Sequence, residues 1–157
     1  MIDMFLDIPG IPGESVNEVH RNEIDVLAYS IGFSSAGDTR GSKPVAQNLS
    51  VTVYYSKASP PLFSALCAGT VFAKVTLSAR IPGPTPREFL TLTLEQVIVT
   101  SDSHGGSGGE DRPTQNFTFA FARISYAYVG AGAGTGEVVP PVRAGFDFEK
   151  LRPIGVP

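Results

Sequence analysis

The sequence predicts an all-β, mainly antiparallel fold: a small two-sheet β-barrel with one short flanking α-helix. Three observations lead to this prediction. Apolar residues recur at every second position through most of the chain, two predicted strands change phase midway, and only one segment has helical spacing. The 157 residues, 42% of them hydrophobic, suffice for one domain with its own core. We expect residues 1–147 to form this barrel domain and residues 148–157 to be a C-terminal tail.

The period-two alternation places the predicted strands at residues 2–8, 26–33, 48–55, 71–81, 87–101, 114–128 and 142–148. In the second strand, Leu27, Tyr29 and Ile31 form the larger apolar face, which we expect to pack in the core. The opposite face would then be smooth and uncharged, and it carries Val26, Ala28 and Ser30.

Two predicted strands switch their apolar face partway along. Leucines at 90, 92 and 94 give way to Val97 and Val99, and phenylalanines at 117, 119 and 121 give way to Ile124, Tyr126 and Tyr128. A one-residue slip moves side chains to the other face, so each switch predicts a bulge or a sharp bend. Long bent strands that serve two sheets can close a small barrel. The alternative is a strand with both faces buried.

One segment has the signals of a helix. Ser59 is the expected N-cap, Pro60 sits in the first turn, and Gly69 can end the helix. The apolar stripe between them comprises Leu62, Phe63, Leu66 and Cys67. We interpret Cys67 as a small buried apolar residue.

The sequence offers no enzyme template, and we predict no catalytic residue, cofactor or metal site. The two histidines, His20 and His104, are too few for a three-histidine metal site, and both are expected to be solvated turn residues. A Gly-x-Ser-x-Gly nucleophile elbow and a phosphate-binding glycine loop are both missing from the sequence. The single cysteine excludes an internal disulfide.

Charge and hydropathy exclude two further classes. Fifteen acidic and twelve basic residues give a net charge of −3 without basic clusters, so we predict no nucleic-acid partner. No apolar run reaches the ~18 residues of a membrane span, so membrane insertion is not expected. The first residues lack the basic and apolar regions of a signal peptide.

Two polar loops are candidate interaction sites. Residues 34–44 are rich in glycine, serine and charge, and we expect them to extend from the barrel with Asp38, Arg40 and Lys43 exposed. A second loop carries Gly105, Gly106 and Gly108 followed by Glu110, Asp111 and Arg112. We interpret its charged end as a salt-bridged loop terminus.

Six segments, taken in order, carry a resemblance to one family: residues 3–6 with 13–15, 23–30, 47–50, 57–60 with 67–69, 105–114, and 116–119. Together they resemble the haemolysin-coregulated protein (Hcp) family, the tube subunits of bacterial type VI secretion systems. The resemblance covers about residues 3–147. The sequence departs from the family pattern in its proline-rich turn at 81–86, in Tyr29 and Ile31, where tryptophans are common, and in the tail after Asp147.

The resemblance implies a homohexameric ring that stacks into a hollow tube, with a spike protein at its tip and a contractile sheath around it. It further implies effector proteins in the lumen, a lumen-facing second strand, and a 34–44 loop that reaches the next ring. Such a protein is cytoplasmic before firing and is then secreted without a signal peptide. A phage-type tail tube protein and a monomeric ligand-binding barrel are the alternatives.

Overall fold

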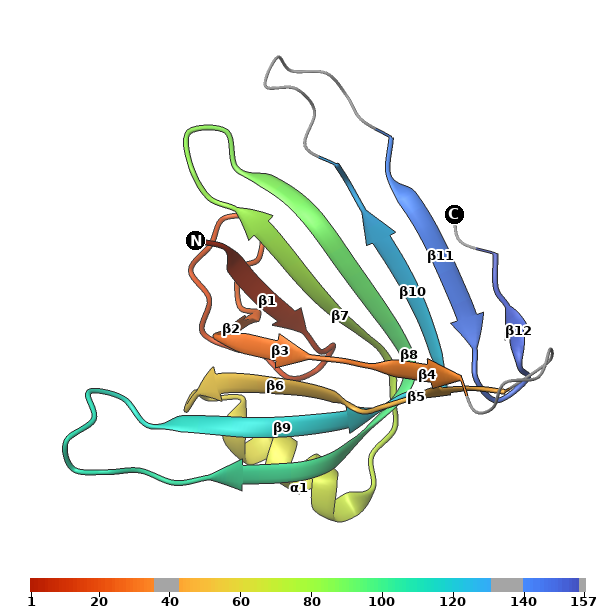
Figure 1. Cartoon of the computed structure of the whole chain (residues 1–157). Helices are drawn as coiled ribbons and strands as arrows, with labels where there is room; N and C mark the ends of the chain where they lie inside the picture. The colour runs from red at the N-terminus through yellow and green to blue at the C-terminus, as the bar shows by residue number, and fades with distance from the viewer. Residues whose placement is uncertain (36–42, 131–139, 156–157) are drawn as a thin grey trace.

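The computed structural model describes residues 1–35, 43–130 and 140–155 (Figure 1). In chain order the elements are β1 (Asp3–Asp7), β2 (Ile24–Val26), β3 (Ala28–Ser30), β4 (Phe33–Ser35), β5 (Pro44–Ala46), β6 (Leu49–Tyr54), α1 (Ser59–Ala68), β7 (Phe72–Ile81), β8 (Arg87–His104), β9 (Thr114–Ala120), β10 (Arg123–Tyr128), β11 (Val142–Asp147) and β12 (Arg152–Pro153).

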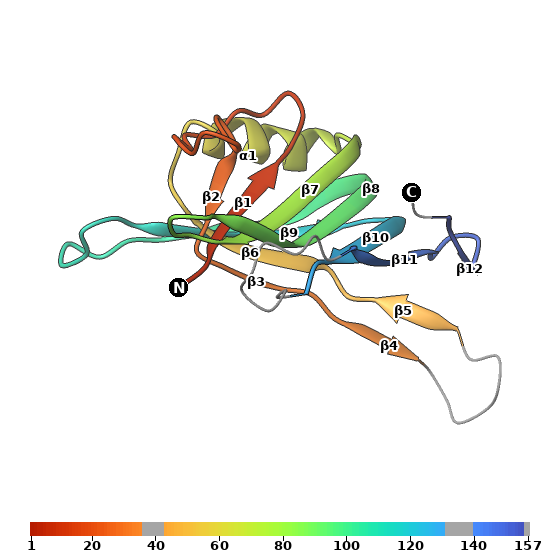
Figure 2. The same cartoon turned by 90° about the horizontal axis from the view of Figure 1, so that it is seen from above.

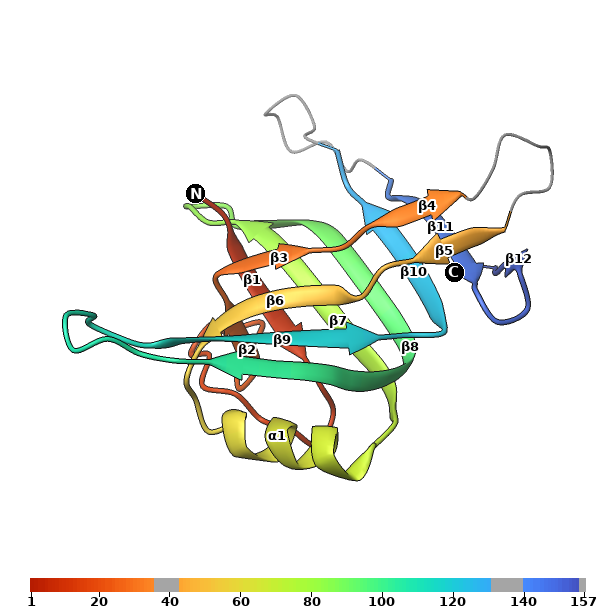
Figure 3. The same ribbon diagram turned by 60° about the horizontal axis from the view of Figure 1, so that its bottom comes forward.

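Two antiparallel sheets enclose the core. The first has the strand order β12-β11-β10-β8-β7-β1-β2, and the second pairs β3, β6, β9 and the far half of β8. Figure 3 shows the second sheet with α1 beside it. Side chains from both sheets meet in one buried cluster that includes Leu49, Val75, Leu94, Val97 and Phe119. The predicted all-β fold with one short helix is confirmed.

Strand β8 belongs to both sheets because it bends at Gln96. It pairs with β10 up to Glu95 and with β7 up to Val97, and from Ile98 onward it pairs with β9. Gln96 has a φ of 54°, in the left-handed region of backbone conformation that residues other than glycine seldom adopt. Leu94 and Val97 on either side are both fully buried. The first predicted phase change is therefore a sharp bend that keeps both halves facing the core.

The second phase change is a break between two strands. Strand β9 pairs with β6 in the second sheet, whereas β10 pairs with β8 and β11 in the first. At the crossing, the Ala122 N–H donates to the Glu95 carbonyl at 3.1 Å, and the Phe148 N–H donates to the Ala122 carbonyl at 2.8 Å. The connection thus keeps its backbone hydrogen bonds while the chain changes sheets.

The predicted second strand, residues 26–33, spans parts of β2, β3 and β4, and this corrects the assignments of Val26 and Leu27. In β2, Val26 pairs with Met4 of the first sheet and is only 6% exposed. The chain then crosses to the second sheet at Leu27, whose N–H donates to the Thr52 carbonyl and whose side chain is 41% exposed. Alternation restarts in β3, so Ala28 and Ser30 are exposed as expected but Val26 lies in the core.

The helix ends where predicted, but the side of the helix that is buried differs from the predicted one. Gly69 ends it with a φ of 66°, but Ser59 is the first helical residue and Ala58 occupies the cap position. Leu62 and Ala65 are buried, whereas Phe63 is 56% exposed and Cys67 is also exposed. The buried face thus keeps Leu62 of the predicted stripe but turns toward Ala65 and away from Phe63 and Cys67. Its small Ala65 lets the helix approach the sheet, and the expectation of a buried Cys67 is wrong.

The residues after Asp147 add one short strand to the first sheet. Strand β12 pairs with β11 through Phe146 opposite Pro153 and Asp147 opposite Arg152. Phe148, between these strands, packs its ring against Phe146 and Phe121.

The bend at Gln96 is testable by substitution. Gln96→Val should lower the free energy of unfolding by about 1–2 kcal/mol, because a β-branched side chain clashes with the backbone in the left-handed region. Gln96→Gly should be at least as stable as wild type. Urea unfolding measures both. Lys74→Val, at an exposed position of the regular strand β7, is the control and should change little. Equal stability of the valine and glycine variants would contradict the strained bend.

Candidate assembly surfaces

The outer side of the second sheet is lined with short uncharged side chains. Ser30 pairs with Ser50, Ser50 with Thr118, and Ala28 with Thr52 across neighbouring strands. We call the surface formed by Ala28, Ser30, Ser50, Thr52, Asn116 and Thr118 the neutral face. It contains both exposed members of the predicted lumen-facing set.

Many polar groups of the neutral face are hydrogen-bonded to other side chains of the same sheet. The Asn116 amide donates to Ser50 Oγ at 3.1 Å and to Thr52 Oγ1 at 3.3 Å. Thr118 Oγ1 lies 2.6 Å from the hydroxyls of both Thr100 and Ser101. Because these polar groups already have partners, the face gives a neighbouring molecule few groups to bind strongly.

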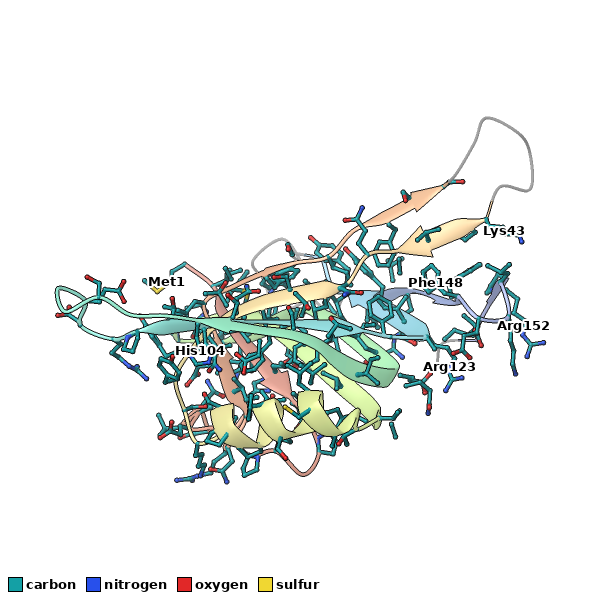
Figure 4. The ribbon with its side chains drawn as sticks, turned by 90° about the horizontal axis from the view of Figure 1, so that it is seen from below. Met1, Lys43, His104, Arg123, Phe148 and Arg152 are labelled. Carbon is teal, nitrogen blue, oxygen red and sulfur yellow. The ribbon has the colours of Figure 1, made fainter. Side chains whose placement is uncertain are left out.

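The predicted extension is a hairpin that projects from the barrel. Strands β4 and β5 form their own two-stranded sheet, which extends away from the body in Figure 2. The Phe33 ring in β4 stacks on Phe148, with centroids 5.9 Å apart and planes 8° apart. Lys43, just before β5, is exposed at the outer end of this hairpin (Figure 4). Asp38 and Arg40 lie outside the described residues.

The glycine-rich loop between β8 and β9 differs from the expectation at its charged end. Gly105, Gly106 and Gly108 are exposed, as are Glu110, Asp111 and Arg112. The Arg112 guanidinium lies 4.0 Å from the centroid of the Tyr54 ring, a cation–π contact. Among the described side chains, the salt bridges include neither Glu110 nor Asp111. Arg112 therefore ties the loop to β6 through an aromatic ring, and the predicted salt-bridged terminus is wrong.

His20 is a buried residue, contrary to the sequence prediction. Its ring stacks on the Phe5 ring with centroids 4.6 Å apart, and the residue is only 6% exposed. Nδ1 lies 3.0 Å from the Glu23 carboxylate, and Nε2 lies 2.7 Å from Glu88 Oε1. Burial raises the pKa of Glu23, while His20 acts to lower it. The spacing of His20 and Glu23 was visible in the sequence, but Glu88 comes from a distant strand.

A second buried ionisable group anchors the turn after β11. Asp147 Oδ1 accepts the N–H groups of Glu149 and Lys150, both at 2.9 Å. Arg123 lies 4.0 Å from Asp147 Oδ2 and also pairs with Glu95 at 3.0 Å. The Lys150 N–H, with the Glu149 N–H and the Arg123 charge, lowers the pKa of Asp147 despite its burial. This turn positions Phe148, and through it the base of the hairpin.

The described part of the chain contains neither a cluster of metal-ligating side chains nor a membrane-spanning helix. No group of three or more histidine, cysteine, aspartate or glutamate side chains in the described part of the chain could hold a metal ion. Over the same residues, no helix combines the length and hydropathy of a membrane span.

The family model for "Type VI secretion system effector, Hcp" matches residues 5–128. The chain belongs to the Hcp family. Protein hcp1 of Pseudomonas aeruginosa is 39% identical to it, over 74% of this chain and 76% of that protein. The fold of the present chain matches the crystal structure of Hcp1 from Salmonella typhimurium with a TM-score of 0.84 at 30% sequence identity. The match covers 98% of the present chain and 99% of the Salmonella chain.

A type VI secretion system effector from Yersinia pestis is also 30% identical, with a TM-score of 0.77 over 92% of this chain and 99% of that one. Hcp family membership makes the chain a type VI secretion protein and indicates a structural role rather than an enzymatic one. The Hcp resemblance predicted from the six sequence segments is confirmed.

The Asp147 turn gives a pH-dependent prediction. Because the pKa of Asp147 is lower in the folded chain than its ordinary value of 3.8, its contribution to stability is present above that pH and is lost as pH falls. Asp147→Asn should therefore lower Tm at neutral pH, and the difference from wild type should shrink in acid. Glu149→Gln, at an exposed neighbour, is the control. A difference that grows as pH falls would contradict the assignment.

Proposed function

We propose that this Hcp-family chain is the tube protein of a type VI secretion system, forming hexameric rings that stack into the expelled inner tube. The observation that carries the proposal is the neutral face on the second sheet. In the ring it lines the lumen through Ala28 and Ser30, flanked by Ser50 and Thr118. The family, the fold and the exposure of these side chains support this orientation.

The neutral face suits a channel that must release what it carries. Short hydroxyl and amide side chains that are already hydrogen-bonded exert little pull on a passing protein, and the named residues carry no charge. Effector proteins could lie against this wall during expulsion without strong adhesion. A lumen lined by large apolar side chains would instead retain its cargo.

Ring contacts need apolar surface elsewhere on the barrel. Tyr126 and Tyr128 of β10 are both exposed, and Val142 of β11 lies directly opposite Tyr128 and is exposed too. Exposed tyrosines are frequent in protein interfaces. A stable contact between neighbouring subunits must bury roughly 1,000 Å² or more. In our proposal, the face of β10 and β11 that carries these side chains supplies one part of that area, and it is the same face of the sheet that carries Leu90 and Leu92 of β8.

The β4–β5 hairpin is the proposed contact between stacked rings. It projects from the body and has a fixed base, because Phe33 stacks on Phe148. Lys43 is exposed, and Asp38 and Arg40 precede it in the same polar segment of the sequence. Each exposed charge pair contributes only about 0–1 kcal/mol, but six symmetric copies act at each junction.

The remaining parts of the proposal follow from tube assembly. A spike protein caps the tube, and a contractile sheath surrounds it before firing. The chain is then cytoplasmic until contraction, and it leaves the cell with the tube. A phage-type tail tube protein and a monomeric ligand-binding barrel gain no support from the family assignment.

Light scattering at about 100 μM, well above typical working affinities, should give a mass near six times the chain mass of 16.6 kDa. Deletion of residues 37–42 should keep this mass but prevent the growth of tubes seen by electron microscopy, because the hairpin contact is lost. Raising the salt concentration should weaken stacking of the wild type.

Two comparisons sharpen this test. Lys43→Glu should reduce tube growth, whereas Lys57→Glu, an exposed charge away from the hairpin, should not. A monomeric mass would contradict ring formation. Long tubes formed by the deletion variant would leave rings intact but contradict the role of the hairpin.

A further inference from the structure

A surface cleft of about 420 Å³ lies where α1 begins, β8 ends and β9 starts. Its walls are mainly apolar and include Pro60, Phe63 and the Tyr55 ring, and its polar lining includes Asp102, His104 and Gln115. Figure 4 shows His104 near the glycine-rich end of the molecule, remote from the hairpin that carries Lys43. The cleft is therefore separate from the proposed stacking contact.

Two buried acceptors in the cleft lack donors. The Asp102 side chain is 3% exposed, and Gln115 is 3% exposed as a residue. The Gln115 amide nitrogen donates to Asp102 Oδ1 at 2.9 Å. Asp102 Oδ2 and Gln115 Oε1 have no hydrogen-bond partner among the described residues. An unpaired buried acceptor is costly, and a carboxylate oxygen is more so, which makes these atoms the natural target of a donor from outside.

The described groups around the cleft do not hydrogen-bond these two acceptors. At the start of α1 the Ser59 N–H bonds the Ser56 carbonyl, Pro60 and Pro61 have no N–H, and the Leu62 N–H bonds the Ala58 carbonyl. The first turn of the helix therefore offers no free N–H group to an anion. His104 Nδ1 is bonded to the Tyr55 hydroxyl, and its Nε2 lies 3.8 Å from Asp102 Oδ1, beyond hydrogen-bond distance.

We propose that this cleft binds the side chain of a lysine presented by a partner protein. A lysine ammonium has three donors and no acceptor, which matches Asp102 Oδ2 and Gln115 Oε1. Its aliphatic stem would pack along Pro60 and Phe63, with the positive charge near the Tyr55 ring. The acceptors lie below the surface, which favours the narrow ammonium over the broad guanidinium of arginine. This binding site does not depend on ring formation.

Amide chemical shifts of the whole chain can follow binding of Nα-acetyl-lysine-N-methylamide. We expect the chemical shift of the Gln115 side-chain amide to change and to saturate, with a Kd in the millimolar range. The uncharged analogue Nα-acetyl-norleucine-N-methylamide should cause no such change. Equal responses to the two probes would overturn the proposal. Binding of cadaverine without binding of the lysine probe would also overturn it, because the ligand would then be a free amine and not a protein side chain.

Variants identify the groups responsible. Asp102→Asn should weaken binding of the lysine probe at least about tenfold, because it removes the buried charge. Asp111→Asn, which changes an exposed carboxylate in the adjoining β8–β9 loop outside the cleft lining, is the matched control and should bind as wild type. Unchanged binding by Asp102→Asn would refute the site.

A wall variant keeps the test decisive if Asp102→Asn fails to fold. Phe63 is mostly exposed, so Phe63→Ala should fold normally and should weaken the lysine probe several-fold through loss of the apolar wall. Wild-type affinity in Phe63→Ala would contradict the proposed path of the lysine stem.

Discussion

The bend of β8 at Gln96 is the constraint on which the rest of the structure depends. It lets one continuous strand serve both sheets, with Leu94 and Val97 buried on either side of a residue in the left-handed region. Backbone pairing and core burial together hold this conformation against its intrinsic cost. Without the turn, one half of β8 would direct its apolar side chains to solvent, and the two sheets could not enclose one core.

Closure of the barrel determines which surfaces are left for assembly. Apart from Tyr54 at the end of β6, strands β3, β6 and β9 direct their large side chains inward, so their outer side keeps the short residues of the neutral face. The change of sheet at Leu27 brings β3 beside β6, and the break before β10 sends the chain back to the first sheet. The Asp147 turn then places Phe148 against Phe33, which links the end of the chain to the base of the hairpin.

Sequence patterns predicted the features that depend on local periodicity. The switch from Leu94 to Val97 revealed the bend because both halves of the strand face one core. Periodicity failed where a strand ends without a turn signal: Val26 and Ser30 looked like one face, although they belong to different sheets.

The missed contacts are long-range ones. Burial of His20 depends on Glu88, and the cleft depends on the pairing of β8 with β9, which brings Asp102 and Gln115 together. A single sequence shows the residues at these positions but not the strand register that joins them.

An electron cryo-microscopy reconstruction of the assembled protein at side-chain resolution would show directly which face of the barrel lines the channel. We expect a closed ring in which Ala28, Ser30, Ser50 and Thr118 face the central channel. A ring with this face buried between subunits or turned to the outside would contradict this expectation.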